Sequence, residues 1–280
     1  MDSIAYYNGN FDRRQDLKIP LSDRALFFGD GIYDAAIAVS GKIVWENEHI
    51  DRFFDNAAAL GLCHDLTKEK LKLLLRETVK KSNFENGFLY FQMSRNSEKR
   101  IHSAKGLKKS NLLITVEKFT FLSPEKQLSL ITFPDERYGY CNIKTLNLLP
   151  SVLAATDAEN KECDEAVFIR EGCVTECSHS NIFIVKDDTV ITHPKSKHIL
   201  PGIAREKIIA ACHNLKIPVL EEPFTQEDLL SADEILISST TKLCLGANMV
   251  DGIAVGGKKA ELRRKIYGEL HKELVKFSNI

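Results

Sequence analysis

The 280-residue sequence has no excess of charge of either sign. Its 38 lysines and arginines stand against 39 aspartates and glutamates, for a formal net charge of −1. The sequence therefore predicts no electrostatic field that would attract nucleic acid or an anionic membrane. A run of about 18 apolar residues, which a membrane-spanning helix needs, is also missing. Residues 1–18 become charged early and lack the apolar core of a signal peptide. We therefore expect a cytoplasmic protein.

Motifs for metals and nucleotides are missing too. Only Cys173 and Cys177 of the seven cysteines lie close together, and no second Cys or His pair completes a zinc site. We therefore predict no metal. Neither a GxGxxG nor a GxxxxGK[ST] loop is present, so the loops that cradle nucleotide phosphates are absent. Cys177 stands before Ser178-His179 and could be a nucleophile, but a buried, unreactive thiol is the commoner outcome.

The apolar patterning predicts short strands with isolated helices between them. In the first part we expect strands at 31–39, 42–45, 88–94 and 111–119, a helix capped by Asn47 that ends near Leu60, and a second helix capped by Thr67. In the second part we expect strands at 128–133, 165–170, 173–176, 181–185, near 219 and at 234–237, and helices at 151–160, after 202 and after 257.

The segment 122–127, which contains Pro124, shows little periodicity. We place the interdomain linker at 120–127, between a small N-terminal domain, 1–119, and a larger C-terminal domain, 128–280. Short adjacent strands with isolated helices favour an α+β fold over a doubly wound parallel sheet.

Taken alone, the residues offer four candidate sites, each with an alternative. Apolar neighbours can lower the pKa of Lys144 and make it a nucleophile, although such a lysine can equally extend to water. The hydroxyl run 238–241 and the helix start at 201–205 could bind an anion, or could only begin the next element. Arg100 and His102 place two cationic groups close together, or form a solvated edge.

The order of these features, however, matches a known pattern. Residues 22–34 carry D-R-x-x-x-x-G-D-G-x-Y-[ED], residues 143–147 surround a lysine with K-[ST]-x-N, and residues 174–183 contain T-E-x-x-x-S-N-[IV]-F. Residues 47–52 and 200–205, with the hydroxyl run, complete the series. The chain resembles the fold-type IV pyridoxal-phosphate enzymes, which include D-amino acid aminotransferases, branched-chain aminotransferases and aminodeoxychorismate lyase. The resemblance implies an α+β, two-domain fold with the cofactor between a small N-terminal and a larger C-terminal domain.

The resemblance also implies the cofactor, pyridoxal 5′-phosphate, and its binding residues. Lys144 would be the catalytic residue that binds the cofactor aldehyde as a Schiff base and moves the substrate proton. Glu176 would face the ring nitrogen, with Arg137 supporting it, unless Arg137 is an ordinary surface charge. The remaining predicted cofactor-binding residues hold the phosphate or cover the ring: Arg52, Leu200, Ile203, Ala204, Ser239 and Thr240. D-amino acid enzymes carry threonine in place of Ala204, so we expect weaker cofactor retention.

Tyr33, Arg100 and His102 match the residues that bind the substrate carboxylate in D-amino acid aminotransferases, where the arginine and histidine come from the partner subunit. The resemblance therefore implies a homodimer with shared active sites, which moves the amino group of a D-amino acid, D-alanine first, to a 2-oxo acid such as 2-oxoglutarate. An L-branched-chain aminotransferase, an aminodeoxychorismate lyase and a non-catalytic cofactor-binding relative stay open as alternatives.

Overall fold

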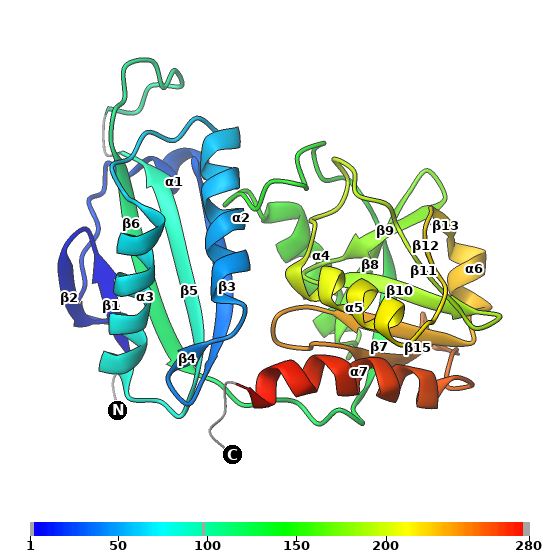
Figure 1. Ribbon diagram of the computed structural model, residues 1–280. Helices are drawn as coiled ribbons and strands as arrows, with labels where there is room; N and C mark the ends of the chain where they lie inside the picture. The colour runs from blue at the N-terminus through cyan, green and yellow to red at the C-terminus, as the bar shows by residue number, and fades with distance from the viewer. Residues whose placement is uncertain (1–2, 97–98, 277–280) are drawn as a thin grey trace. The chain divides into compact units, whose positions relative to one another are not determined.

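The computed structural model describes residues 3–96 and 99–276 and divides them into two compact units (Figure 1). The first unit consists of the described parts of Met1–Thr120, Ile143–Asn147 and Leu274–Ile280. The second consists of Phe121–Asn142 and Leu148–Glu273. In the described ranges, none of the helices has both the length and the apolar character needed to cross a bilayer.

The first unit contains a six-stranded antiparallel sheet in the order β2-β1-β6-β5-β3-β4. Its strands are β1 (Ile4–Tyr7), β2 (Asn10–Arg13), β3 (Gly31–Val39), β4 (Lys42–Ile43), β5 (Asn86–Arg95) and β6 (Ser110–Lys118). Its helices are α1 (Arg24–Phe28), α2 (Glu46–Ala59) and α3 (Lys68–Ser82).

Helices α2 and α3 pack their apolar sides against this sheet. Phe53 of α2 and Leu71 and Leu75 of α3 are buried together with Leu89 and Phe91 of β5 in one core. Since side chains alternate along a strand, one face of β5 supplies this core. The two helices thereby hold β3, which carries the predicted site residue Tyr33, in a fixed place.

The second unit contains a ten-stranded sheet in the order β12-β11-β10-β14-β15-β7-β8-β9-β13, with β16 paired to β15. Its strands are β7 (Gln127–Pro134), β8 (Glu165–Arg170), β9 (Cys173–Cys177), β10 (Asn181–Lys186), β11 (Thr189–Thr192), β12 (Val219–Glu221), β13 (Phe224–Thr225), β14 (Glu234–Ser238), β15 (Leu245–Val250) and β16 (Ile253–Ala254). Its helices are α4 (Leu149–Asn160), α5 (Ile203–Asn214), α6 (Gln226–Leu230) and α7 (Ala260–Val275).

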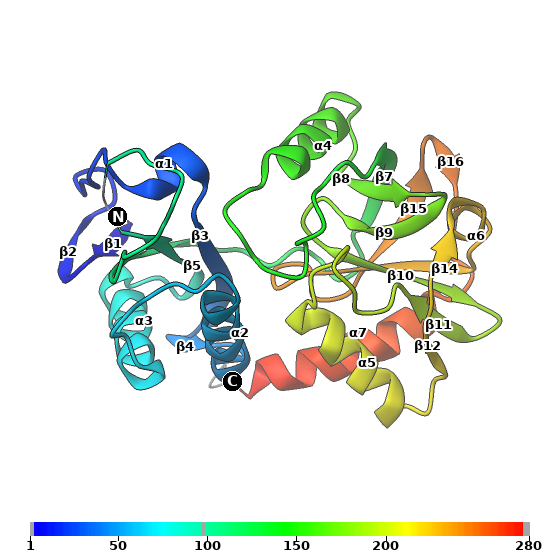
Figure 2. The same ribbon diagram turned by 90° about the horizontal axis from the view of Figure 1, so that it is seen from above.

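The ten-stranded sheet is mixed: β7 runs parallel to β8 and β15, and β11 runs parallel to β12, whereas the other pairs are antiparallel. Helix α4 packs on Phe168, whereas the next strand residue on the amino side, Val167, contributes to a separate core. Helices α5 and α7 lie side by side (Figure 2), and the Lys207 ammonium lies 3.5 Å from the Glu273 carboxylate between them. This arrangement confirms the predicted α+β class.

Candidate active site

Lys144 lies in the segment Ile143–Asn147, which groups with the first unit, whereas the sequence analysis assigns these residues to the C-terminal domain. Backbone hydrogen bonds to β3 are the physical reason. The Tyr33 N–H donates to the Lys144 carbonyl over 2.9 Å, and the Leu146 N–H donates to the Gly31 carbonyl over 3.1 Å. The Lys144 Nζ lies 4.4 Å from the centre of the Tyr33 ring. Strand β3 therefore holds the predicted catalytic lysine beside a predicted substrate-binding residue.

Gly31 allows this close approach between the lysine segment and β3. A Cβ atom on Gly31 would lie 2.4 Å from the Met93 carbonyl oxygen and 2.9 Å from Leu146 Cδ1. The first distance is not tolerable, because it involves backbone that cannot move aside. The second glycine of the G-D-G sequence is therefore required for packing, which places a structural constraint beside Lys144.

Arg52 of α2 forms a two-contact ion pair with Asp34 of β3. Its Nε and Nη2 donate to Oδ2 and Oδ1, each over 2.8 Å. Oδ1 also lies 2.8 Å from Nδ1 of His49, and the Asp34 and His49 side chains are buried. Burial by itself raises the pKa of Asp34, but the charges and hydrogen bonds of Arg52 and His49 lower it well below the usual range. Asp34 is therefore a buried carboxylate anion.

The three predicted substrate-binding residues lie in two places of the first unit. Tyr33 stacks on Tyr90 with ring centres 5.4 Å apart. Arg100 and His102 are exposed, and both lie against Phe28. The Arg100 guanidinium carbon is 5.3 Å from the centre of the Phe28 ring, and the centre of the His102 ring is also 5.3 Å from it. In the described part of this unit, no hydrogen bond or ion pair joins Tyr33 to either cation. Within the first unit of one chain, Tyr33 thus does not form one cluster with Arg100 and His102.

The exposed loop that carries Arg100 and His102 is nevertheless fixed. Arg24 is buried and donates to the carbonyl oxygens of Ile101, over 2.5 Å, and His102, over 3.1 Å. Asp30 in turn accepts a hydrogen bond from Arg24 Nε over 2.8 Å. Arg24 of the D-R pair, held by Asp30 of the G-D-G sequence, therefore fixes the backbone of this loop, while the cationic side chains of Arg100 and His102 stay exposed.

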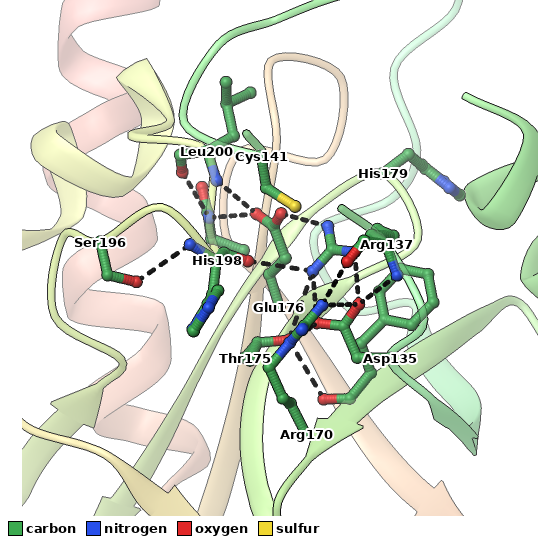
Figure 3. Close-up of polar contacts among 12 residues, drawn as sticks. Asp135, Arg137, Cys141, Arg170, Thr175, Glu176, His179, Ser196, His198 and Leu200 are labelled. Atoms are coloured by element: carbon green, nitrogen blue, oxygen red, sulfur yellow. Dashed lines mark hydrogen bonds and ion pairs between the residues drawn. The ribbon is translucent and has the colours of Figure 1, made fainter. Parts of the chain in front are cut away.

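Glu176, at the end of β9, has a carboxylate that three donors engage. Oε1 accepts from Arg137 Nη1 over 2.5 Å, and Oε2 accepts from the Asn181 amide and the Leu200 backbone N–H, each over 3.0 Å. Figure 3 shows Arg137 and Leu200 on different sides of this carboxylate. Asn181 also donates to the Leu200 carbonyl over 2.9 Å, so it ties the loop before α5 to Glu176. These contacts favour the ionised form of the carboxylate.

Arg137 is not an ordinary surface charge, because its side chain is only 9% exposed. Its Nε and Nη2 donate to Asp135 over 2.9 and 3.0 Å, and its guanidinium lies 4.2 Å above the Phe168 ring. Arg170 also binds Asp135 (Figure 3). Burial by itself raises the pKa of Asp135, but the two arginines lower it to about 2. Arg137 is thus held by one anion and faces another, Glu176.

The predicted anion-binding residues lie at two turns of the second unit. Helix α5 begins at Ile203 after Gly202, and its first N–H groups, including that of Ala204, have no acceptor within the helix. A Cβ atom on Gly202 would lie 2.1 Å from Asn181 Oδ1, so only glycine fits there. After β14, the hydroxyl oxygen of Ser239 accepts from the backbone N–H of Lys242 over 3.1 Å, which shapes the turn that carries Thr240.

One buried ion pair of the second unit, Lys242 with Glu165, was not predicted. Lys242 Nζ donates to Glu165 Oε2 over 2.7 Å and lies 2.8 Å from Nε2 of His179. Glu165 also accepts from the backbone N–H of His179 over 2.8 Å. This network fixes the turn between β9 and β10. Nothing in the local pattern around Lys242 marked it, because its partners lie far away in the sequence.

The cysteine nucleophile considered from the sequence is not supported by the described residues. Cys177 is buried, and burial raises the pKa of its thiol well above the usual range, which disfavours the nucleophilic thiolate. Among residues 3–96 and 99–276, no group of three or more His, Cys, Asp or Glu side chains could hold a metal ion.

The chain belongs to the amino-transferase class IV family, whose model matches residues 31–249. It is therefore an aminotransferase-family enzyme. Two curated relatives are D-alanine aminotransferases: that of Listeria monocytogenes serotype 4b is 36% identical and covers 96% of this chain and 95% of its own length. That of Bacillus licheniformis is 32% identical over 96% of both chains.

Solved structures show the same fold. The branched-chain aminotransferase of Thermoproteus uzoniensis, solved with norvaline, has a TM-score of 0.87, is 26% identical and covers 98% of both chains. The branched-chain enzyme of Escherichia coli has a TM-score of 0.89 at 21% identity and covers 99% of this chain and 95% of its own. At that identity the second similarity establishes the fold alone.

Class IV aminotransferases are pyridoxal-phosphate enzymes, which confirms the predicted cofactor. The donor set of this chain fits that cofactor. Glu176 would supply an anion for a protonated ring nitrogen, and the start of α5 with the Ser239 turn would supply N–H and hydroxyl donors for a phosphate. Lys144 would supply the amine that the cofactor aldehyde requires.

Proposed function

We propose that this enzyme transfers the amino group of a D-amino acid, D-alanine first, to 2-oxoglutarate and so yields pyruvate and D-glutamate. One observation carries this proposal: Tyr33, Arg100 and His102 are all present in the sequence of a chain whose named curated relatives are D-alanine aminotransferases. Three groups that bind a carboxylate on one side of the cofactor decide which substituent of the α-carbon faces the catalytic amine, and therefore decide the hand of the substrate.

The bound cofactor supplies the electron sink that makes the α-proton of the amino acid removable. In our proposal Lys144 would accept the Cα proton on Nζ and deliver it to the cofactor carbon that is bonded to the substrate nitrogen, and in the second half of the transfer it would carry a proton in the opposite direction. Glu176 holds the proton on the ring nitrogen, which keeps the ring electron-poor. Arg137 keeps Glu176 ionised through its contact with Oε1.

The remaining predicted residues hold the cofactor in place. Arg52 supplies a charged donor to the phosphate, at about 1.5–3 kcal/mol for each charge-assisted hydrogen bond. The backbone N–H groups of Ile203 and Ala204 and the hydroxyls of Ser239 and Thr240 are the other proposed phosphate donors. Leu200 is proposed to cover one face of the ring, because its backbone already binds Glu176.

The proposed enzyme is a homodimer in which each subunit completes the other's site. Exposed apolar side chains in both units support a partner surface. In α4, Leu149, Val152 and Leu153 are 66, 54 and 56% exposed, and in the first unit Leu26 and Ile101 are 52 and 57% exposed. Clusters of exposed apolar side chains are typical of protein–protein interfaces. Ile101 lies between Arg100 and His102, the residues that the proposal assigns to the partner's site.

A panel of D- and L-amino donors with 2-oxoglutarate tests the proposal. We expect turnover with D-alanine and little or none with L-leucine or L-valine. Turnover of the L-donors without D-alanine would overturn the proposal in favour of an L-branched-chain activity, the activity named for the solved relative at 26% identity. Release of pyruvate from aminodeoxychorismate without any oxo-acid acceptor would instead identify a lyase.

A further inference from the structure

Asp34 is a buried, charged residue that has no role in the proposed function. It points from the middle of β3 toward α2, and its side chain has no exposed surface. Its Oδ1 accepts from the Ala35 backbone N–H, lies next to His49 Nδ1 and accepts from Arg52 Nη2, each at 2.8 Å. Oδ2 accepts from Arg52 Nε, also at 2.8 Å. Besides Arg52, two partners therefore fix this carboxylate: Ala35 of β3 and His49 of α2.

The geometry of the ion pair determines the position of the arginine. A guanidinium is planar and has five N–H donors, and Asp34 engages two of them along the Nε–Nη2 edge. Two parallel contacts fix both the plane and the rotation of the group, which a single contact could not do. Asp34 therefore orients the Arg52 guanidinium.

His49 holds the carboxylate in this orientation. Because ionised Asp34 can only accept, His49 Nδ1 carries the proton and donates to Oδ1. Burial lowers the pKa of His49, with the Asp34 charge opposing this effect, so the imidazole is neutral at neutral pH. A neutral imidazole fixes the carboxylate by a hydrogen bond but does not neutralise its negative charge. Arg52 is therefore the cation that pairs with this charge.

We propose that Asp34, supported by His49, is a positioning residue that fixes the Arg52 guanidinium for the cofactor phosphate. The inference rests on the proposed function, in which Arg52 binds that phosphate. It goes beyond that function because it makes the affinity for the phosphate depend on a carboxylate that does not contact the cofactor. A carboxylate beside a phosphate site would on its own repel the anion, and this one is neutralised by the arginine that it orients.

The test compares pyridoxal phosphate with pyridoxal, which lacks the phosphate. Cofactor is stripped from the purified dimer, and the dissociation constants of both compounds are measured by absorbance titration for the wild type and for Asp34→Asn, His49→Gln and Arg52→Met. We expect Asp34→Asn to weaken pyridoxal phosphate binding about 10-fold or more, as loss of a group that orients a ligand-binding residue commonly does, and to leave pyridoxal binding unchanged. His49→Gln keeps the ion pair and should give a smaller loss of the same kind.

A matched control separates positioning from general destabilisation. Glu234 is another buried carboxylate that lies 3.6 Å from an arginine, Arg263, in the second unit, and Glu234→Gln should not change the ratio of the two dissociation constants. Equal weakening of both compounds in Asp34→Asn, or in His49→Gln if the first variant does not fold, would overturn the inference. If Arg52→Met itself leaves the ratio unchanged, the proposed role of Arg52 is wrong; if only Arg52→Met changes it, the inference about Asp34 is wrong.

Discussion

Arg137 Nη1 donates to Glu176 Oε1 over 2.5 Å while the other edge of the same guanidinium binds Asp135. One arginine thus links the carboxylate proposed to face the cofactor ring with a second, wholly buried carboxylate. An unpaired charge in a low-dielectric interior is strongly disfavoured, so this cation stabilises both anions, and Asp135 has Arg170 as a second cationic partner. The proposed electronic role of Glu176 therefore depends on a residue that need not touch the ring.

Arg137→Met should lower both stability and catalysis. Removing one partner of a buried ion pair costs about 3–5 kcal/mol in the free energy of unfolding, since the remaining charge is left uncompensated. Without the cation, protonated Glu176 becomes more favourable, so we also expect kcat to fall at neutral pH. Urea denaturation and steady-state kinetics check the two effects, with Arg137→Lys as the charge-retaining control. An unchanged kcat in a folded Arg137→Met protein would contradict the assigned role.

Asp135 should make stability depend on pH in the acid range. Its pKa is lowered from the usual value near 3.8 to about 2, so the folded state binds the proton less readily than the unfolded state. Its contribution is therefore complete above about pH 4 and is lost as the pH falls toward 2; this depression corresponds to about 2 kcal/mol. Compared with Asp135→Asn in urea denaturation, the wild type should be more stable by at least this amount at pH 7. The advantage should shrink below pH 4, and a constant difference down to pH 2.5 would contradict the assignment.

Lys144→Ala should abolish the visible absorbance of the purified enzyme that comes from covalently held cofactor, because no other amine is proposed to bind the aldehyde. The visible absorbance spectrum, recorded after gel filtration, checks this. Lys242→Met serves as a comparison, since Lys242 is engaged by Glu165 and His179. A variant at position 144 that keeps the band would show that another lysine binds the cofactor.

The sequence was sufficient to predict the helices and strands whose ends carry residues with a strong local preference for turns or helix caps. β3 spans Gly31–Val39 as predicted, and Thr67 caps α3 by accepting from the Lys70 N–H over 3.1 Å. The cap predicted at Asn47 is wrong: α2 begins at Glu46 after Trp45, which has φ 51° and makes no side-chain cap bond. Tertiary contacts, and not a capping side chain, start this helix.

Local sequence patterns could not predict which strands or side chains from distant segments pair with one another. The strand β15, Leu245–Val250, was not predicted because its Gly-Ala-Asn sequence has weak strand preference, yet it lies between β14 and β7. For the same reason the sequence analysis paired Arg137 with Glu176 but did not pair Arg52 with Asp34 or Arg137 with Asp135. Asp34 and Asp135 become informative only once folding buries them beside the two arginines.

Ala204→Thr should strengthen cofactor binding. Ala204 is the second residue of α5, and threonine there would add a hydroxyl donor at the proposed phosphate site. A hydrogen bond to a charged group contributes about 1.5–3 kcal/mol, or about 10-fold or more in the dissociation constant of pyridoxal phosphate. Ala210→Thr, an exposed position in the same helix, is the matched control for the lower helix preference of threonine. Equal affinities of the wild type and Ala204→Thr would place the phosphate away from this residue.

Mixed dimers test whether Arg100 acts in the partner's site. The Lys144→Ala and Arg100→Ala variants should each be nearly inactive as pure proteins. When the two are denatured together and refolded, about half of the dimers are hybrids. If Arg100 serves the partner, each hybrid has one site with both an intact Lys144 and an intact Arg100, so about a quarter of the wild-type activity returns.

The opposite arrangement gives a different result. If Arg100 served its own subunit, every site in every hybrid would lack one of the two residues, and mixing would restore nothing. The structure favours the first outcome, because within the described first unit no hydrogen bond or ion pair joins Arg100 or His102 to Tyr33, while Arg24 holds their loop with both side chains exposed. A control mixture of Lys144→Ala with Tyr33→Phe, whose two residues are in contact in one subunit, should stay inactive.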